Sequence, residues 1–251
     1  MFFRVPVSIC LFLVLCLNIG TAYAIEESPK KLIEWEGQVQ LASKYIYRGM
    51  NLSNKLAPSL SMGATHRSGF FANFWLGRDD IAGLLGTARD EDVETEYLIG
   101  YQRVFTRQWS ASISRVWHEF IQDDQPQNHD YQETVLRVNH ATAGSVSVGY
   151  ARDIWSTGLN LGFVYYQYRD VREAVGRKFY LVHELGSNLF DRGSSNRPST
   201  RLDYYSLSAA TPLDKGFSVQ ASYSHGKPSN NNFFNQDRVG SQWVLVLRNA
   251  F

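Results

Sequence analysis

Cysteine is almost missing from this sequence: Cys10 and Cys16 are the two that it contains. The rest of the chain therefore has no thiol that could form a disulfide, bind a metal through sulfur or act as a nucleophile. Both cysteines fall in a segment, Met1 to Ala24, that combines a basic residue, an apolar run and small residues at its end. This pattern predicts a secretory signal peptide over residues 1–24, cleaved after Ala24.

Long apolar runs are also missing beyond this segment, and neither sign of charge prevails. No later run approaches the roughly 20 apolar residues that a membrane-spanning helix needs, and the mean hydropathy is -0.29. These features exclude a helical membrane protein. The formal net charge is +1, with 25 basic and 24 acidic residues, and gives no indication of a nucleic-acid partner. No linker rich in proline or serine divides residues 25–251, so we expect one domain there.

Aromatic residues are abundant by contrast, and many lie in segments that alternate apolar and polar side chains. Phe, Tyr and Trp together make up 14% of the sequence. In the last segment, Gly240 to Phe251, the residues Trp243, Leu245 and Leu247 share one parity and Arg248 falls on the other. A period of two predicts a β-strand. A strand of this kind with a final Phe is typical of bacterial outer-membrane barrels, in which one parity faces lipid and the other faces the lumen.

Eleven further segments show alternation or a bounded apolar run, which brings the predicted strands to twelve. The predicted strands are Ile33 to Arg48, Ala57 to His66, 70–77, Val93 to Val104, Gln108 to Phe120, Asp130 to His140, 145–150, 159–166, 176–185, 205–210, 217–224 and Gly240 to Phe251.

The connections between these segments alternate in length. Long polar connections follow the first, third, fifth, ninth and eleventh segments, whereas those after the second, fourth, sixth and tenth are short. This asymmetry and the even strand number predict an all-β fold: a transmembrane antiparallel up-and-down β-barrel with both termini in the periplasm. Two connections depart from the pattern, because Arg152 to Thr157 is short for an outer loop and Asp170 to Val175 is long for a turn. A soluble β-sandwich, which also has short alternating strands, is the alternative fold.

The alternation also predicts which side chains face outward. In the eighth strand we expect Leu159, Leu161, Phe163 and Tyr165 to face lipid. Aromatic residues near strand ends are expected to form the two interface girdles. They are Trp35, Tyr45, Tyr47, Trp75, Tyr101, Trp109, Trp117, Trp155, Tyr165 and Trp243. Facing stays open in the fifth strand, where Arg115 falls on the apolar parity, and in segment 176–185, which is apolar on both parities.

Three stretches of sequence carry a resemblance to a known family. The run YIYRGMNLS at Tyr45 to Ser53, then Pro58, then the run SGFFANFW at Ser68 to Trp75 resemble the TorF-type family of outer-membrane porins. Members of that family open with a strand that ends in an aromatic-Arg-Gly turn. The resemblance implies a barrel in the outer membrane of a Gram-negative bacterium, with a pore role that we expect to be passive diffusion of small polar solutes or ions. Asn249 departs from the usual pattern, since closing strands commonly have an aromatic or apolar residue two before the final Phe.

Polar residues on the inward parities are the candidates for lining the lumen. They are Glu34, Glu36, Gln40, Lys44, Arg48, Glu94, Glu96, Gln102, Glu133, Arg137 and Arg248. Rings of charge inside a pore set its selectivity, whereas acids and bases that pair across a narrow interior fill it; the sequence leaves both open. Arg48 either lines a constriction that attracts anions or holds its glycine turn by bonding loop carbonyls. We expect Arg248 to enter the lumen near Glu34 or Glu36.

Two other functions remain as alternatives. Some barrels of this size hydrolyse lipids with a Ser-His pair, but Ser114 and His118 would lie about 13 Å apart along one strand, too far to bond. We therefore expect no catalytic residue, although a lipid-acting enzyme with a pair across strands stays an alternative. The long connections Gly186 to Arg201 and Gly226 to Val239 suggest the other, a structural or adhesive barrel that acts through its loops.

No cofactor or metal is expected. Asp79-Asp80 and Asp90 to Asp92 flank one connection, but they lack the ligand spacing of a known calcium loop. The expected partners are outer-membrane lipids and lipopolysaccharide, the barrel-assembly machinery during insertion, and small polar solutes.

Overall fold

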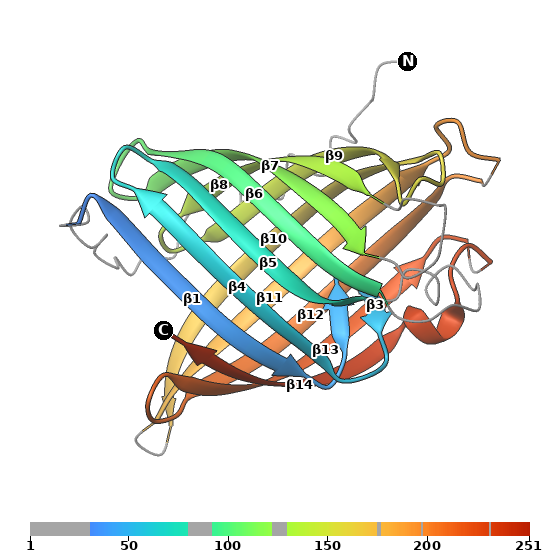
Figure 1. The fold of residues 1–251 in the computed structure, drawn as a ribbon. Coiled ribbons are helices and arrows are strands. Elements are labelled where there is room, and N and C mark those ends of the chain that lie inside the picture. The colour runs from blue at the N-terminus through green and yellow to red at the C-terminus, as the bar shows by residue number, and fades with distance from the viewer. Residues whose placement is uncertain (1–30, 80–91, 122–129, 175–176, 197, 231) are drawn as a thin grey trace.

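The strands close into a single antiparallel barrel (Figure 1). The structure is a computed structural model that describes residues 31–79, 92–121, 130–174, 177–196, 198–230 and 232–251. Twelve strands of these segments form the wall, as the sequence predicts. The predicted signal peptide and most of the acidic connection 79–92 lie outside the described residues. No helix in the described segments is long and apolar enough to cross a membrane.

Each wall strand pairs with its neighbours in sequence, apart from the pair that closes the barrel. The wall strands are β1 (Ile33–Ala42), β4 (Ala57–His66), β5 (Phe70–Asp79), β6 (Asp92–Val104), β7 (Trp109–Ile121), β8 (Tyr131–His140), β9 (Gly144–Ile154), β10 (Leu159–Ala174), β11 (Arg177–Asp191), β12 (Thr200–Pro212), β13 (Phe217–Pro228) and β14 (Ser241–Ala250). A two-stranded hairpin, β2 (Tyr45–Tyr47) and β3 (Met50–Ser53), and a short 3-10 helix, η1 (Gln236–Arg238), complete the described elements.

Pairing of β14 with β1 closes the barrel. The ladder runs from Gln38 opposite Ala250 to Ala42 opposite Val246. Gly37 and Phe251 then exchange two backbone hydrogen bonds of 3.0 and 2.9 Å. A side chain at Gly37 would overlap the Phe251 ring, so the missing Cβ makes room for that ring. Closure pairs the backbone groups along this ladder. An open sheet edge would leave such groups without hydrogen bonds in lipid, where no water can replace them.

The outer face of the wall is apolar and the inner face is mixed. In β14 the side chains of Trp243, Leu245 and Leu247 are exposed on the outer face, whereas Gln242 and Val244 are buried inside. This is the facing that the alternation of the last segment predicts. The alternation of β8, β9, β12 and β13 also predicts the observed facing, since Leu136, Val148, Leu207 and Val219 are exposed on the outer face.

The predicted first strand, Ile33 to Arg48, is too long. The wall strand β1 stops at Ala42, and the chain leaves the wall at Ser43, where backbone and hydroxyl bond Leu245. The following residues turn inward as the β2–β3 hairpin (Figure 1). Every residue of β3 is buried. Tyr45 and Tyr47, which we predicted for a membrane girdle, therefore lie in the lumen. The alternation fits the hairpin as well as a continuing strand, so the period alone could not separate them.

The facing predicted for the eighth strand is also wrong. Leu161 and Phe163 of β10 are buried inside the barrel, and Val164 and Tyr166 are exposed on the outer face. Trp155, another predicted girdle residue, is 3% exposed and packs inside. The apolar parity of β10 therefore packs in an interior core and does not face lipid, as the general rule for barrels predicts it would.

That interior core fills one end of the barrel. We call it the loop end, and it is the end at which β5, β7, β9, β11 and β13 finish; the opposite end is the turn end. Hairpin residues Met50 and Leu52 pack in the core with side chains from the wall and from the connection before β14. Its buried members are Met50, Leu52, Phe120, Tyr131, Ala151, Ile154, Trp155, Leu159, Leu161, Phe163, Phe190, Leu202, Phe233, Phe234 and Val239. This end of the lumen is thus packed like a protein core.

Several connections are shorter than predicted. Strands β10 and β11 extend to Ala174 and Arg177, so the connection that looked long for a turn is short. Strand β11 continues to Asp191 and β12 begins at Thr200, so the two strands together take half of the predicted loop Gly186 to Arg201 into the wall. The short outer connection predicted at Arg152 to Thr157 is real: β9 ends at Ile154 and β10 begins at Leu159.

The facing of β10 can be tested by labelling. In a protein expressed from residue 25, which has no cysteine, a single cysteine at Val164 should be quenched by nitroxide lipids after labelling with a fluorophore. A cysteine at Phe163 should be protected, because that side chain lies in the lumen core. Equal quenching at the two positions would contradict the facing of this strand.

Candidate functional site: the lumen and its inward hairpin

The hairpin turns at Arg48 and Gly49, and both have positive φ, 47° and 79°. Two central residues in this region give the type of tight turn that joins adjacent antiparallel strands. Glycine adopts it freely, whereas Arg48 adopts it at a cost of about 1–3 kcal/mol. The turn must therefore be held by contacts of the hairpin with the wall.

Arg48 supplies the strongest of these contacts. Its two terminal nitrogens donate to the two carboxylate oxygens of Glu133 on β8, at 2.9 and 2.8 Å. The guanidinium also lies over the Phe163 ring, 3.5 Å from its centroid. The side chains of Arg48 and Glu133 are 7% and 1% exposed. Burial alone would lower the pKa of Arg48, but the carboxylate of Glu133 raises it well above its usual value, so the guanidinium stays charged.

Glycines and one tyrosine seat the tip of the hairpin. The side-chain amide of Asn188 donates to the Arg48 carbonyl at 2.9 Å. Tyr204 fits beneath Gly49, where a Cβ would lie 2.4 Å from the Tyr204 Cβ, and its ring crosses Gly186 of the adjacent strand. Gly226 lies close to the carbonyl of Gly49. The tip thus docks on β11, β12 and β13, opposite the wall that holds Glu133.

A second polar cluster adjoins the Arg48–Glu133 pair. His118 of β7 is 1% exposed, and its Nδ1 lies 2.7 Å from Oε1 of Glu94 on β6. Glu96 lies 3.4 Å from the same nitrogen, and Nε2 faces Glu133 at 3.9 Å. The His118 ring stacks on Tyr131 with centroids 4.2 Å apart. Three inward carboxylates, one guanidinium and one imidazole are therefore concentrated beside the hairpin.

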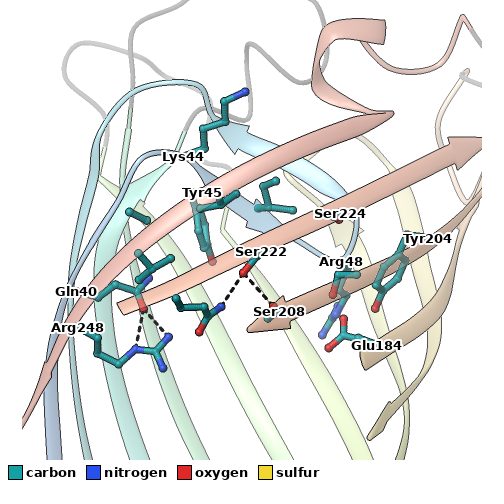
Figure 2. Close-up of a pocket in the computed structure, with 17 residues that line it drawn as sticks. Gln40, Lys44, Tyr45, Arg48, Glu184, Tyr204, Ser208, Ser222, Ser224 and Arg248 are labelled. Atoms are coloured by element: carbon teal, nitrogen blue, oxygen red, sulfur yellow. Dashed lines mark hydrogen bonds between the residues drawn. The ribbon is translucent and has the colours of Figure 1, made fainter. Parts of the chain in front are cut away.

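A polar cavity of about 230 Å³ lies between the hairpin and the opposite wall (Figure 2). The hairpin contributes Tyr45 and Arg48, and the wall strands β1 and β11 to β14 contribute mainly hydroxyl and amide side chains. The polar wall residues are Gln40, Glu184, Ser206, Ser208, Gln220, Ser222, Ser224 and Arg248. Such a lining can hydrogen-bond polar solutes or water without fixing one charge sign.

The candidate lining residues from the sequence divide into three sets. Arg48, Glu94, Glu96 and Glu133 meet in the buried clusters described above. Gln40, Lys44, Arg48 and Arg248 line the cavity.

The third set lies on the inner parity away from both clusters and the cavity. Glu34, Glu36 and Gln102 are exposed, and Arg137 donates to Ser147 and Tyr165. Lys44, which belongs to the set that lines the cavity, donates to Gln242 at 2.7 Å.

The partner predicted for Arg248 is wrong. It donates to Gln40 at 3.3 and 3.0 Å, because Gln40 is its direct partner in the β1–β14 ladder. Glu34 and Glu36 lie beyond the end of that ladder. The sequence does show the parity of these residues, but the register depends on where β1 and β14 begin to pair, which alternation does not specify.

Some residues of the cavity and of the hairpin seat were not among the candidates from the sequence. Glu184, Gln220 and the serines of β12 and β13 line the cavity, but their facing or small size gave no distinctive signal. Tyr204 and Gly186, which seat the hairpin tip, were also missed. Both lie just outside the predicted strands 176–185 and 205–210, so the pairing of this aromatic residue with a glycine on the next strand gave no signal.

The ion pair at the hairpin can be tested with a double-mutant cycle. Arg48→Met should lower the free energy of unfolding by about 3–5 kcal/mol, because it leaves a buried carboxylate uncompensated. Arg48→Met with Glu133→Leu should lose less than the single change. Urea unfolding in detergent, followed by tryptophan fluorescence, measures both.

Arg201→Met is the matched control, since Arg201 pairs with Asp203 at 3.0 Å on the exposed surface. It should change stability by about 0–1 kcal/mol. A loss at Arg48 no larger than this would show that the buried pair does not hold the hairpin.

The fold of the chain is similar to that of porins whose structures have been solved. A KdgM porin matches with a TM-score of 0.50 at 9% identity, over 86% of this chain and 99% of that one. A KdgM porin in complex with disordered oligogalacturonate matches with the same TM-score at 10% identity, over 86% and 98%. With its apolar outer surface, this fold confirms the predicted outer-membrane barrel. No curated protein matches. The family model described as "Bacterial protein of unknown function (Gcw_chp)" matches residues 26–251, and the chain belongs to that family.

Proposed function

We propose that the protein is a passive outer-membrane channel for small polar solutes or ions. The observation that carries the proposal is the polar cavity between the inward hairpin and the wall from β11 to β14. Hydroxyl and amide groups there can replace the hydration of a solute that moves through a confined space. The likeness in fold to the KdgM porin supports the same class of function.

The hairpin narrows the path at the loop end. It packs into a core of apolar side chains on one side, so the space left for a solute lies on its other side, along the cavity. Lys44, Arg48 and Arg248 bring positive charge to this space, and Glu184 brings negative charge. We therefore propose a narrow path that admits small solutes and ions of either sign.

The pore-lining set predicted from the sequence belongs to this proposal. Residues near the turn end, such as Glu34, Glu36 and Gln102, would form the wide entrance, and Gln40, Lys44, Arg48 and Arg248 the narrow part. Glu94, Glu96, Glu133 and Arg137 would act on the path through the charge they hold beside it. Lipids and lipopolysaccharide outside the barrel, and the assembly machinery during insertion, are the other proposed partners.

The proposal includes the finer family assignment, a TorF-type porin, and the lack of catalysis. His118 is engaged by carboxylates, with Glu94 Oε1 2.7 Å from its Nδ1. The loop residues Phe233 and Phe234 are buried in the lumen core, which weakens the adhesive alternative. The polar cavity therefore favours a channel over a lipid-acting enzyme or an adhesive barrel.

Removing the hairpin should widen the channel. Ala42 and Ala57 are direct partners in the β1–β4 ladder, so an Asn-Gly turn can replace residues 43–56 and continue β1 into β4. In planar bilayers, the shortened protein should show larger single-channel conductance steps than wild type. A complete lack of steps in both proteins would refute the channel function.

A point substitution keeps the hairpin in the chain and tests the same idea. Gly49→Ala should unseat the tip, because a Cβ there would overlap Tyr204 and the φ is +79°. Gly240→Ala is the matched control, since Gly240 has a φ of +102° with no neighbour to meet a Cβ. Conductance should rise in the first variant and stay at the wild-type level in the second. Unchanged conductance in both the shortened protein and Gly49→Ala would show that the hairpin does not limit flow.

A further inference from the structure

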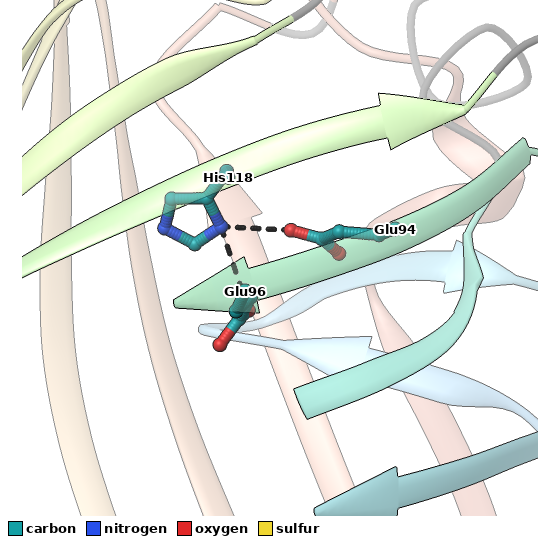
Figure 3. Close-up of side chains that lie close together, drawn as sticks. All are labelled: Glu94, Glu96 and His118. Atoms are coloured by element: carbon teal, nitrogen blue, oxygen red, sulfur yellow. Dashed lines mark hydrogen bonds and ion pairs between the residues drawn. The ribbon is translucent and has the colours of Figure 1, made fainter. Parts of the chain in front are cut away.

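Glu94, Glu96 and His118 form a compact set of possible metal ligands (Figure 3). One ligand atom from each lies within 4.8 Å of the others. Oε1 of Glu94 and Oε1 of Glu96 lie 2.7 and 3.4 Å from Nδ1 of His118. Ligands of one ion at bond lengths of about 2.0–2.2 Å are separated by similar distances, so a small outward shift of Glu94 would admit an ion.

Strand register fixes these three side chains on the inner face. Glu96 and His118 are direct partners in the β6–β7 ladder. Glu94 lies two residues from Glu96, which places it on the same face of the same strand. Ligands carried by paired strands hold their spacing better than ligands on loops.

An unsatisfied buried atom points to a further ligand at this position. Glu94 is 2% exposed, and its Oε2 has no hydrogen-bond partner among the described residues, while Oε1 contacts His118. A buried carboxylate oxygen without a partner is costly. A cation bound to Glu94 would remove this cost.

The charge around the set is also unbalanced. Arg48 is committed to Glu133 through two hydrogen bonds. Among the described residues, the imidazole of His118 is the basic group that contacts the carboxylates of Glu94 and Glu96. Two carboxylates beside one imidazole have room for more positive charge than a single proton supplies.

The surroundings of His118 resemble the support that proteins give to a metal-bound histidine. Such a histidine commonly directs its second nitrogen toward a carboxylate, which fixes the ring and its tautomer. Nε2 of His118 lies 3.9 Å from Oε2 of Glu133, beyond hydrogen-bond distance, and has no hydrogen-bond partner among the described residues. A small shift of the ring toward Glu133, which Arg48 holds, would form this bond. Stacking on Tyr131, with ring planes 7° apart, also restrains the ring.

We propose that Glu94, Glu96 and His118 bind one divalent transition-metal ion inside the barrel, through Nδ1 and one or more oxygens of each carboxylate. Imidazole with carboxylates suits Zn²⁺, Co²⁺ or Mn²⁺, whereas Ca²⁺ and Mg²⁺ favour sites built from oxygen alone. The ion enters past Glu96, whose side chain is 22% exposed. It takes the place of the proton between His118 and Glu94, so binding releases a proton when the histidine is charged.

Metal titration of the refolded protein in detergent tests the site directly. Isothermal titration calorimetry should give one Zn²⁺ per chain, and Ca²⁺ should not compete. Co²⁺ should produce visible absorption bands that Zn²⁺ abolishes. His118→Asn, Glu94→Gln and Glu96→Gln should each weaken Zn²⁺ binding by about 10-fold or more.

Matched variants separate this site from chance binding. His225→Asn removes a histidine that contacts Ser241 on β14, and Glu184→Gln removes a lumen carboxylate bonded to Gln167; both should bind Zn²⁺ like wild type. Heat-modifiable mobility in gels checks that each variant is folded, and Glu96→Gln, the most exposed ligand, tests the site if Glu94→Gln or His118→Asn does not fold.

Two results would overturn the proposal. Absence of Zn²⁺ binding by the wild type would show that the set is an ion pair only. Binding that persists in folded Glu96→Gln and His118→Asn, or that falls equally in His225→Asn, would place the ion elsewhere. These titrations do not involve solute flow, so their outcome is independent of the proposed channel function.

Discussion

A buried ion pair between Arg48 and Glu133 is the interaction on which the interior of this barrel depends. Moving a guanidinium and a carboxylate out of water costs several kcal/mol for each ion, and close pairing with full hydrogen bonding is what offsets it. Here both terminal nitrogens of the arginine reach both oxygens of the carboxylate, and Phe163 covers the cation. Because Arg48 also lies at a turn with positive φ, the ion pair holds a strained hairpin in the lumen.

The hairpin in turn divides the lumen into two environments. On one side, Met50 and Leu52 bring apolar surface against Phe190 and other core residues at the loop end. On the other side, hydroxyl and amide groups face the cavity. A barrel with an apolar outer surface thus also contains an apolar core, which is why inward side chains such as Leu161 and Phe163 are apolar.

The sequence predicted the wall well because the wall obeys a simple rule. Strand β4 begins and ends at the predicted residues Ala57 and His66, and β14 faces as predicted, since its polar parity meets the lumen. The rule fails where the interior is itself apolar. Leu161 and Phe163 carry the same period as lipid-facing residues, and their burial in the core is a tertiary effect that no local pattern reveals.

The candidate site could be predicted only in part, for a related reason. Glu94, Glu96 and Glu133 were assigned to the inner parity, but their meeting depends on register across β6, β7 and β8. The β6–β7 register was accessible, because a short turn at residues 105–108 makes Glu96 the partner of His118. The contact between Arg48 and Glu133 could not be predicted in this way, because it depends on the chain leaving the wall at Ser43.

Sharing of Glu133 links the two buried clusters. The same carboxylate accepts from Arg48 at 2.8 Å and faces Nε2 of His118 at 3.9 Å. An ion held by Glu94, Glu96 and Nδ1 of His118 would fix the ring with Nε2 directed toward Glu133. Since Glu133 also holds the hairpin, the charge state of the β6–β7 cluster and the position of the hairpin are parts of one electrostatic network.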